Sequence, residues 1–236
     1  MANLVTKYIP NALTSCNLMS GCVAIVFALN ANYSMALTFI VVGAVFDFFD
    51  GMSARLLGVS SPIGKELDSL ADVVTFGVAP STMIYTLLFT IDKTGWNDML
   101  AYSVPYVAFV MAAFSAIRLA KFNLDERQTT SFIGLPTPAN ALFWGALIVG
   151  SEEYLYVSSG SIFLLLAMVF FSSWLLVAEI PMFALKFKHW GWRDNKIKYI
   201  FIVSCLPILL RFGITGISVI IAWYICLSVF TSKKNA

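Results

Sequence analysis

Eight stretches of mostly apolar residues divide this chain, and each is close to the length that a helix needs to cross a bilayer. They lie at 12–30, 34–52, 69–91, 101–119, 138–154, 159–184, 197–212 and 214–231. A spanning helix needs roughly 20 such residues. Of the 236 residues, 59% are hydrophobic and 12% are charged, a balance far from that of a soluble domain. The sequence therefore predicts an all-α fold, a polytopic membrane bundle of about eight transmembrane helices.

The distribution of basic residues predicts how the bundle is oriented. If the N-terminus lies in the cytoplasm, only Lys93 and Arg211 of the 15 lysines and arginines face outward. Cytoplasmic loops of membrane proteins carry the excess of positive charge. We therefore expect a protein of the inner (cytoplasmic) membrane with both ends inside, provided that residues 211–213 form a tight turn between the last two spans. No nucleic acid partner is expected.

Acidic residues gather between positions 47 and 72, in the stretch DFFDGMSARLLGVSSPIGKELDSLAD. Asp47 and Asp50 close the second span at i, i+3 spacing, and Asp68 and Asp72 open the third at i, i+4 spacing. Each spacing places a pair of carboxylates on one helix face. The intervening residues expected to break or bend the chain are Gly51, Gly58, Pro62 and Gly64. Two antiparallel helices would bring the four carboxylates together on the cytoplasmic side.

Four neighbouring carboxylates repel one another at a membrane edge unless cations lie between them. The chain has one histidine, and its four cysteines are isolated within apolar spans, so zinc and redox chemistry are not expected. Oxygen ligands alone favour hard ions, and four carboxylates suffice for two of them. The sequence predicts two divalent cations, Mg²⁺ or Mn²⁺, with Ca²⁺ as a further candidate. The alternative is a solvated cluster paired with Arg55 and Lys65.

The acidic stretch also contains residues suited to a phosphate ligand. Gly51 and Ala54 have almost no side chain, so a ligand can approach the helix end closely. Arg55 offers a planar fork of donors to a phosphate. On the first span, polar residues recur at i, i+3 and i+6, and the last of them, Asn17, either faces a nucleotide or forms an interhelical hydrogen bond.

At this point the residues resemble the signature of the CDP-alcohol phosphatidyltransferases at every fixed position. The matching residues, in order, are Asp47, Asp50, Gly51, Ala54, Arg55, Gly64, Asp68 and Asp72. The resemblance implies a homodimeric membrane enzyme with a six-helix core and a polar cavity that faces the cytoplasm. We accordingly expect one integral-membrane domain over residues 1–236, with the core at 12–184 and two additional helices at 197–231. Residues 1–11 form either a short interfacial helix or an ordered leader.

The resemblance also implies a role for each signature residue. The four aspartates hold two divalent metals, which bind the diphosphate of a CDP-linked lipid or alcohol. Asp72 serves in addition as the catalytic base that deprotonates the attacking hydroxyl. The remaining signature residues line the nucleotide and the diphosphate, and they are Gly51, Ala54, Arg55 and Gly64.

Stretches outside the signature look like the phosphatidylserine synthase branch of this family. They are PNALTSCNLMSG (10–21), GKELDSLADVVTFGVAPS (64–81), IRLAKFNL (117–124) and FIGLPTPANAL (132–142). This resemblance implies CDP-diacylglycerol and L-serine as substrates, with phosphatidylserine and CMP as products. It leaves residues 145–236 largely unsupported.

The carboxylate of serine needs a cation in a site that is otherwise acidic. Arg118 and Lys121 lie at i, i+3 where the fourth span meets the cytoplasm, and they can bind that carboxylate. The alternative is ordinary anchoring of both side chains at the membrane surface.

Two other functions are compatible with parts of the pattern. The same chemistry can use another acceptor, namely glycerol 3-phosphate, inositol or choline. A cation transporter would also place acids in a membrane protein, but near the bilayer midplane and within an inverted repeat. The acids here lie at span ends, and no internal repeat is visible.

Overall fold

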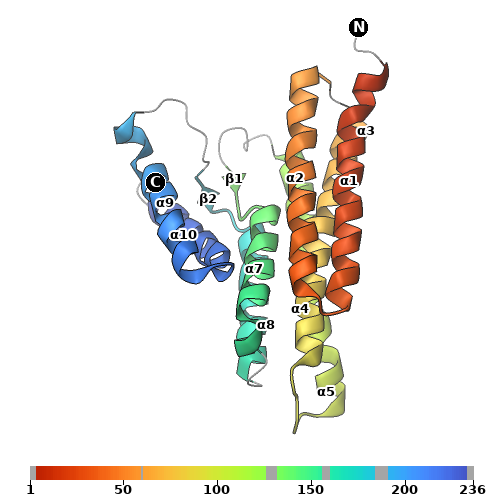
Figure 1. Cartoon of the computed structure of the whole chain (residues 1–236), viewed down its shortest axis with the longest axis vertical. Helices are drawn as coiled ribbons and strands as arrows, with labels where there is room; N and C mark the ends of the chain where they lie inside the picture. The colour runs from red at the N-terminus through yellow and green to blue at the C-terminus, as the bar shows by residue number, and fades with distance from the viewer. Residues whose placement is uncertain (1–3, 60, 126–131, 156–159, 184–190, 233–236) are drawn as a thin grey trace.

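The computed structural model describes residues 4–59, 61–125, 132–155, 160–183 and 191–232, and these residues are almost entirely helical (Figure 1). The helices are α1 (Leu4–Leu29), α2 (Tyr33–Leu57), α3 (Pro62–Asp72), the π-helix η1 (Val73–Val78), α4 (Ala79–Thr90), α5 (Asp98–Ser103), the 3-10 helix η2 (Val104–Ala108), α6 (Phe109–Leu124), α7 (Thr137–Leu155), α8 (Gly160–Val177), α9 (Trp192–Phe212) and α10 (Thr215–Ser232). Two short strands, β1 (Phe132–Ile133) and β2 (Pro181–Met182), pair antiparallel. The predicted all-α class is confirmed.

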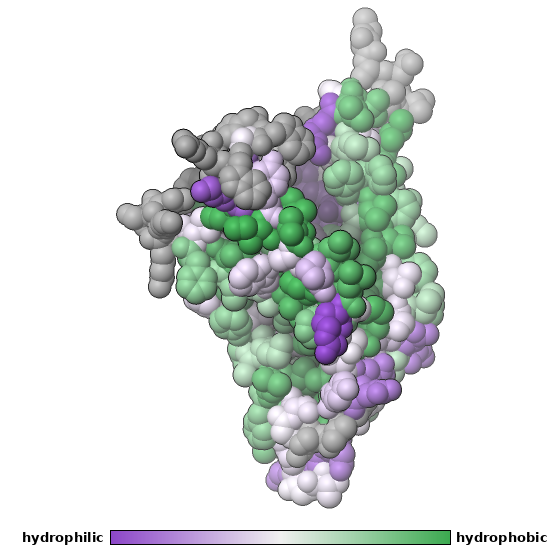
Figure 2. Space-filling model, turned by 60° about the vertical axis from the view of Figure 1, so that its left-hand side comes forward, coloured by the Kyte–Doolittle hydropathy of each residue, from purple (hydrophilic) through white to green (hydrophobic). Residues whose placement is uncertain are grey.

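Several helices join end to end into longer columns. The α3, η1 and α4 segments form one continuous column, and α5, η2 and α6 form another. Five columns are long and apolar enough to cross a membrane: Tyr8–Leu29, Tyr33–Leu57, Pro62–Thr90, Asp98–Leu124 and Gly160–Val177. Hydrophobic residues cover most of the middle of the face in Figure 2. The prediction of a helical membrane bundle is confirmed, whereas the count of eight spans stays a prediction.

The columns pack in an order that brings distant segments together. α1 packs along α2 and also against α3, η1 and α4. α6 packs against η1 and α8, and α7 contacts α2 and α10. The hairpin of α9 and α10 lies tilted beside α7 (Figure 1). The third column is therefore enclosed between α1 and α6, and it carries two of the four aspartates.

Close approach of three helices depends on two glycines. A Cβ at Gly43 would lie 2.5 Å from the Thr75 side chain, and one at Gly21 would lie 2.8 Å from the Thr75 Cα. The Thr75 hydroxyl donates to the backbone oxygen of Asn17 at 3.0 Å. Small residues and interhelical hydrogen bonds are what membrane helices use to pack, because lipid provides no hydrophobic driving force between them. η1, which follows Asp72 directly, is thereby held against α1 and α2.

The chain between the two aspartate pairs turns later than we expected. α2 continues past Gly51 to Leu57 and ends at Gly58, whose φ of 63° is left-handed. α3 begins at Pro62, and the Ser61 side chain caps it by accepting from the Gly64 amide at 2.9 Å. The helix breaks expected at Gly58 and Pro62 are confirmed. The helix breaks expected at Gly51 and Gly64 are wrong, because packing of the continued helices outweighs the modest free-energy cost of a glycine within a helix.

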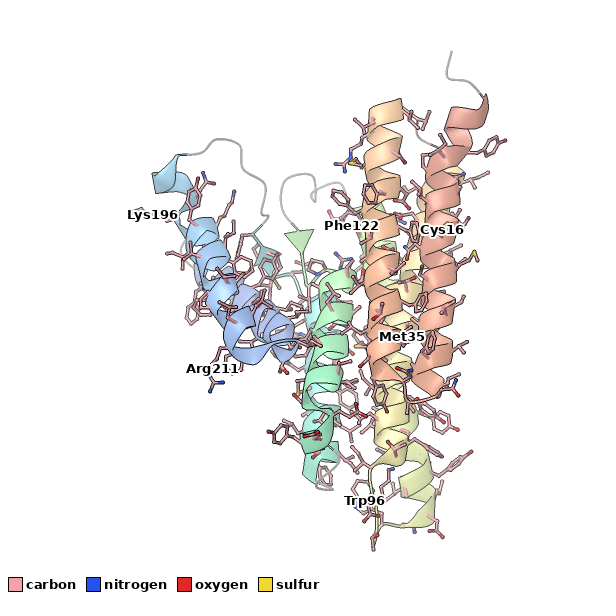
Figure 3. The ribbon with its side chains drawn as sticks, viewed as in Figure 1. Cys16, Met35, Trp96, Phe122, Lys196 and Arg211 are labelled. Carbon is pink, nitrogen blue, oxygen red and sulfur yellow. The ribbon has the colours of Figure 1, made fainter. Side chains whose placement is uncertain are left out.

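The structure corrects one prediction about the N-terminal residues and confirms one about the turn between α9 and α10. Residues 4–11 belong to the single helix α1, so the structure has no separate interfacial helix there. Gly213, with a φ of 56°, separates α9 from α10 and confirms the predicted tight turn. Figure 3 shows Lys196 and Arg211 at opposite ends of α9. Basic residues that support the predicted orientation, among them Arg127, Lys186 and Lys188, lie outside the described residues, so the orientation stays a prediction.

Candidate active site

Three aspartates from two helices meet near one end of the bundle. Carboxylate oxygens of Asp47 and Asp50 on α2 and of Asp68 on α3 all lie within 4.8 Å of one another. Asp72 lies one turn beyond Asp68, at the end of α3. The structure thus brings the two predicted pairs to facing helices, as the i, i+3 and i, i+4 spacings indicated.

The cluster suits hard divalent cations. Asp50 and Asp72 are 6% and 8% exposed, and one buried oxygen of Asp68 accepts no hydrogen bond from the described residues. Within the described part of the chain, no lysine or arginine forms an ion pair with these carboxylates. Buried carboxylates that form no ion pair repel one another, and oxygen donors of this kind are the ligands that Mg²⁺, Mn²⁺ and Ca²⁺ prefer.

Helix α1 provides side-chain hydrogen bonds to two of the four aspartates. The Thr14 hydroxyl lies 2.5 Å from Asp50 Oδ2 and 3.0 Å from the Pro10 backbone oxygen, and it can donate to either. The Asn17 side-chain amide donates to Asp72 Oδ1 at 3.1 Å. Asn17 therefore forms the interhelical hydrogen bond that we considered for it, and it does not line the neighbouring pocket.

A pocket lies between α1, α2 and α3, directly beside the cluster. Its lining includes the signature residues Asp50, Gly51, Ala54, Gly64 and Asp68. Further lining residues, which the signature does not contain, are Pro10, Asn11, Thr14, Val59, Ser61 and Lys65. A hydrophilic recess is visible in the upper half of the face in Figure 2. The pocket continues from the carboxylates toward the N-terminal end of α1.

The two glycines that line the pocket differ in what a larger side chain would contact. A Cβ at Gly51 would meet nothing within 4 Å, so packing of the protein does not require glycine there. A Cβ at Gly64 would lie 2.9 Å from Asn11 Oδ1 and 3.0 Å from Ser61 Oγ, so this glycine allows α3 to approach α1. Open space beside Gly51 is what a bound ligand needs.

Two basic residues near the cluster, Arg55 and Lys65, differ in whether they line the pocket. Arg55 is exposed, its Nε donates to the Gly51 backbone oxygen at 2.9 Å, and it does not line the pocket. Lys65 does line it, and its Nζ donates to the Asn123 backbone oxygen at 3.0 Å. The Asn123 amide donates in turn to Ser69 Oγ at 2.8 Å. The i, i+3 spacing of Lys65 and Asp68 places both residues on one face of α3 and could have indicated Lys65 as a pocket residue. The hydrogen bonds of Lys65 and Asn123 connect α3 to the end of α6.

A second, smaller pocket contains both predicted acceptor residues. Arg118 and Lys121 line it together with Phe122 of the same helix. Arg118 is 7% exposed, and its Nη1 donates to Thr137 Oγ1 at 3.3 Å. Its guanidinium lies 5.7 Å from the centre of the Phe122 ring, and it interacts electrostatically with Asp72. The second pocket is thus linked to the aspartate cluster through Arg118.

Comparison with known proteins shows which family has this arrangement of residues. The sequence model described as CDP-alcohol phosphatidyltransferase matches residues 7–174, more than half of the chain and all four aspartates. The chain belongs to the CDP-alcohol phosphatidyltransferase family. The predicted family is confirmed. Divalent metals are general in the family, and the aspartate cluster is where this member can hold them.

Several curated relatives have the name CDP-diacylglycerol–serine O-phosphatidyltransferase. A protein of Bacillus subtilis is 42% identical over 133 residues, which are 56% of this chain and 70% of the relative. One of Mycobacterium leprae is 34% identical over 183 residues, which are 75% of this chain and 58% of the relative. One of Helicobacter pylori is 33% identical over 173 residues, which are 72% and 70% of the two chains. The resemblance to the serine branch is confirmed.

Proposed function

We propose that this protein transfers the phosphatidyl group of CDP-diacylglycerol to the hydroxyl of L-serine, forming phosphatidylserine and CMP. The observation that carries the proposal is the meeting of Asp47, Asp50 and Asp68 beside a pocket lined by the family signature. The names of the relatives support serine as the acceptor.

The aspartate cluster is suited to the diphosphate of the donor. Asp47, Asp50, Asp68 and Asp72 would hold two divalent cations, Mg²⁺ or Mn²⁺, with Ca²⁺ as the third candidate. Such ions, when bound, neutralise the diphosphate charge and stabilise the departing CMP. Gly51 and Ala54 leave space for the nucleotide in the pocket beside the cluster. Arg55, at the surface near this pocket, can bind a phosphate oxygen of the donor once its side chain turns inward.

Asp72 is the proposed catalytic base. Its carboxylate is held by the Asn17 amide, so one oxygen is fixed and the other can accept the proton of the serine hydroxyl. The serine oxygen forms a bond to the phosphorus that carries the lipid, and the bond from that phosphorus to the CMP oxygen breaks. The electron pair of the broken bond leaves with CMP, and Asp72 keeps the serine proton until the product departs.

Arg118 and Lys121 are the proposed ligands of the acceptor carboxylate. Their positions in one pocket, with Arg118 close enough to interact with Asp72, support an acceptor whose hydroxyl reaches the base while its carboxylate meets these cations. Choline has no anionic group for them, and inositol has no charge. Glycerol 3-phosphate does have an anionic group, so it is the acceptor that competes most directly with serine.

The distribution of basic residues supports a cellular location and an orientation. We place the protein in the cytoplasmic membrane with the aspartates on the cytoplasmic side, because this orientation leaves only Lys93 and Arg211 facing outward. The family resemblance further supports a homodimer. Cross-linking in intact membranes and protease accessibility of engineered loop tags test these two points.

A direct assay tests the function. Purified protein in lipid nanodiscs would receive CDP-diacylglycerol, Mn²⁺ or Mg²⁺, and one acceptor at a time from serine, glycerol 3-phosphate, inositol and choline. We expect CMP release that depends on serine. Faster turnover with another acceptor would overturn the serine assignment and leave the family chemistry intact. Cation flux in proteoliposomes that Asp72→Asn abolishes without affecting CMP release would instead support a transporter.

A further inference from the structure

The second pocket carries charges of both signs. Arg118 and Lys121 lie on α6, and Asp125 caps the end of that helix. Glu179 reaches the same pocket from the segment that follows α8. A pocket that contains both cations and acids matches a ligand that itself carries both charges.

Backbone hydrogen bonds on both sides of Glu179 determine where this residue lies. β2 pairs with β1 so that Pro181 faces Ile133. The Gly134 amide donates to the Ile180 oxygen and the Leu135 amide donates to the Leu175 oxygen, each at 2.9 Å. These contacts hold the chain before and after Glu179 against the segment that leads into α7.

One hydrogen-bond donor at the buried end of the pocket has no partner among the described residues. Arg118 is 7% exposed, and its Nε forms no hydrogen bond with any of the described residues. A buried, charged donor that is unsatisfied is costly, and a ligand carboxylate would satisfy it. Arg118 also interacts electrostatically with Asp72, the proposed base.

We propose that Glu179 is a specificity-determining residue that binds the ammonium group of the acceptor, while Arg118 and Lys121 bind its carboxylate. This inference rests on the proposed function and deepens it, because it assigns a residue to the ammonium group of the acceptor. Glu179 and Asp125 each have a further interaction in the free protein, so the ammonium replaces or joins an existing contact. Glu179 lies beyond the residues that the family model matches.

The pocket also explains how other acceptors would be rejected. A dianion such as glycerol 3-phosphate gains from Arg118 and Lys121 but is repelled by Glu179 and Asp125. A neutral polyol offers no charge to any of the four charged groups. A zwitterion offers an ammonium group to the acids and a carboxylate to the cations.

The experiment compares three ligands that share a hydroxyl group. L-Serine has both charges, 3-hydroxypropanoate lacks the ammonium, and ethanolamine lacks the carboxylate. Their apparent affinities would be measured as substrates or as competitive inhibitors of serine-dependent CMP release. Glu179→Gln should weaken the binding of serine by about tenfold or more, the range for hydrogen bonds to charged groups, and should not weaken the binding of 3-hydroxypropanoate. Its kcat at saturating serine and its KM for CDP-diacylglycerol should stay near wild type.

A reciprocal variant and a matched control complete the test. Lys121→Met should weaken the binding of both serine and 3-hydroxypropanoate and should not weaken the binding of ethanolamine. Glu153→Gln, an exposed glutamate near the end of α7, should change none of the three. Equal losses of serine and 3-hydroxypropanoate in Glu179→Gln would overturn the inference, as would unchanged serine affinity. Absence of serine-dependent turnover in the wild-type protein would instead refute the proposed function.

Discussion

Asn17 on α1 donates its side-chain amide to Asp72 at the end of α3, across a gap of 55 positions in the sequence and 3.1 Å in space. Both residues are buried. Asp72 also interacts electrostatically with neighbouring carboxylates and with Arg118, and the Asn17 amide provides the hydrogen bond that orients it. α1 carries no residue of the family signature, yet it controls the proposed base.

Replacement of Asn17 by Leu should lower the rate of CMP release by roughly 10- to 100-fold, as is typical when the hydrogen-bond partner of a functional carboxylate is lost. The reason is that Asp72 would lose its fixed orientation while its charge remains. Initial rates at saturating donor and serine, with Mn²⁺ titrated, would measure the effect. Ser15→Ala, an exposed change on the same helix, is the control. A wild-type rate in Asn17→Leu would show that Asp72 needs no such support.

Replacement of Asp68 by Asn should have opposite effects on activity and stability. CMP release should fall by at least about 100-fold, because a metal ligand is lost. In a chelator, the thermal midpoint should rise, because one of three mutually repelling carboxylates becomes neutral. Calorimetry in EDTA and binding of Mn²⁺ followed by paramagnetic resonance would measure the second effect. Asp98→Asn, on α5 away from the cluster, should alter neither, and strong Mn²⁺ binding by Asp68→Asn would contradict the site.

Metal removal tests the same cluster in the unmodified protein. A chelator should abolish CMP release, and Mg²⁺ or Mn²⁺ should restore it, because the carboxylates supply only oxygen ligands. Comparing the two ions with Ca²⁺ and Zn²⁺ in the same assay would identify the preferred metal. Full activity after exhaustive chelation would rule out the proposed role of the aspartates.

Replacement of each of the two pocket glycines by alanine should have a different effect on stability. Gly51→Ala should stabilise the protein by about 0.5–1 kcal/mol, because alanine is the better helix residue and the new methyl group has open space. It should nevertheless raise the KM for CDP-diacylglycerol, because the methyl enters the pocket. Gly64→Ala should reduce stability, since its Cβ would crowd Asn11 and Ser61. Thermal midpoints and donor titrations would separate the two cases, and parallel behaviour would contradict this distinction.

Gly134 should be intolerant of substitution. Its φ is 77°, and a Cβ there would lie 2.6 Å from the Leu176 backbone oxygen. Gly134→Ala should destabilise the protein by roughly 1–3 kcal/mol and weaken serine binding, because the segment that positions Glu179 would shift. Gly95→Ala is the matched control, with a φ of 85° and no neighbour within 4 Å. Similar losses in both variants would mean that backbone strain alone, without the clash, explains the effect.

Much of the helical framework was predictable because it depends on local composition. Each predicted apolar stretch contains a helix, and the turn at Gly213 appears where the sequence indicated it. The stretch predicted over 159–184 is only partly helical, because α8 ends at Val177 and β2 (Pro181–Met182) follows it. The breaks expected at Gly51 and Gly64 were wrong because glycine is only weakly unfavourable in a helix that neighbouring helices support. The π-helix η1 was not anticipated, and no periodic pattern in the residues marks it.

The sequence by itself determined which carboxylates share a helix face, since the i, i+3 and i, i+4 spacings of the aspartates are properties of one helix. It also determined the chemistry available to them, because oxygen ligands dominate the stretch. Only the tertiary structure decided which partners those faces meet: Asn17 for Asp72, and Glu179 for the pocket of Arg118. These partners lie on helices and loops far apart along the chain. Their meeting depends on how closely the helices pack, which glycines such as Gly21 and Gly43 permit and which no local spacing encodes.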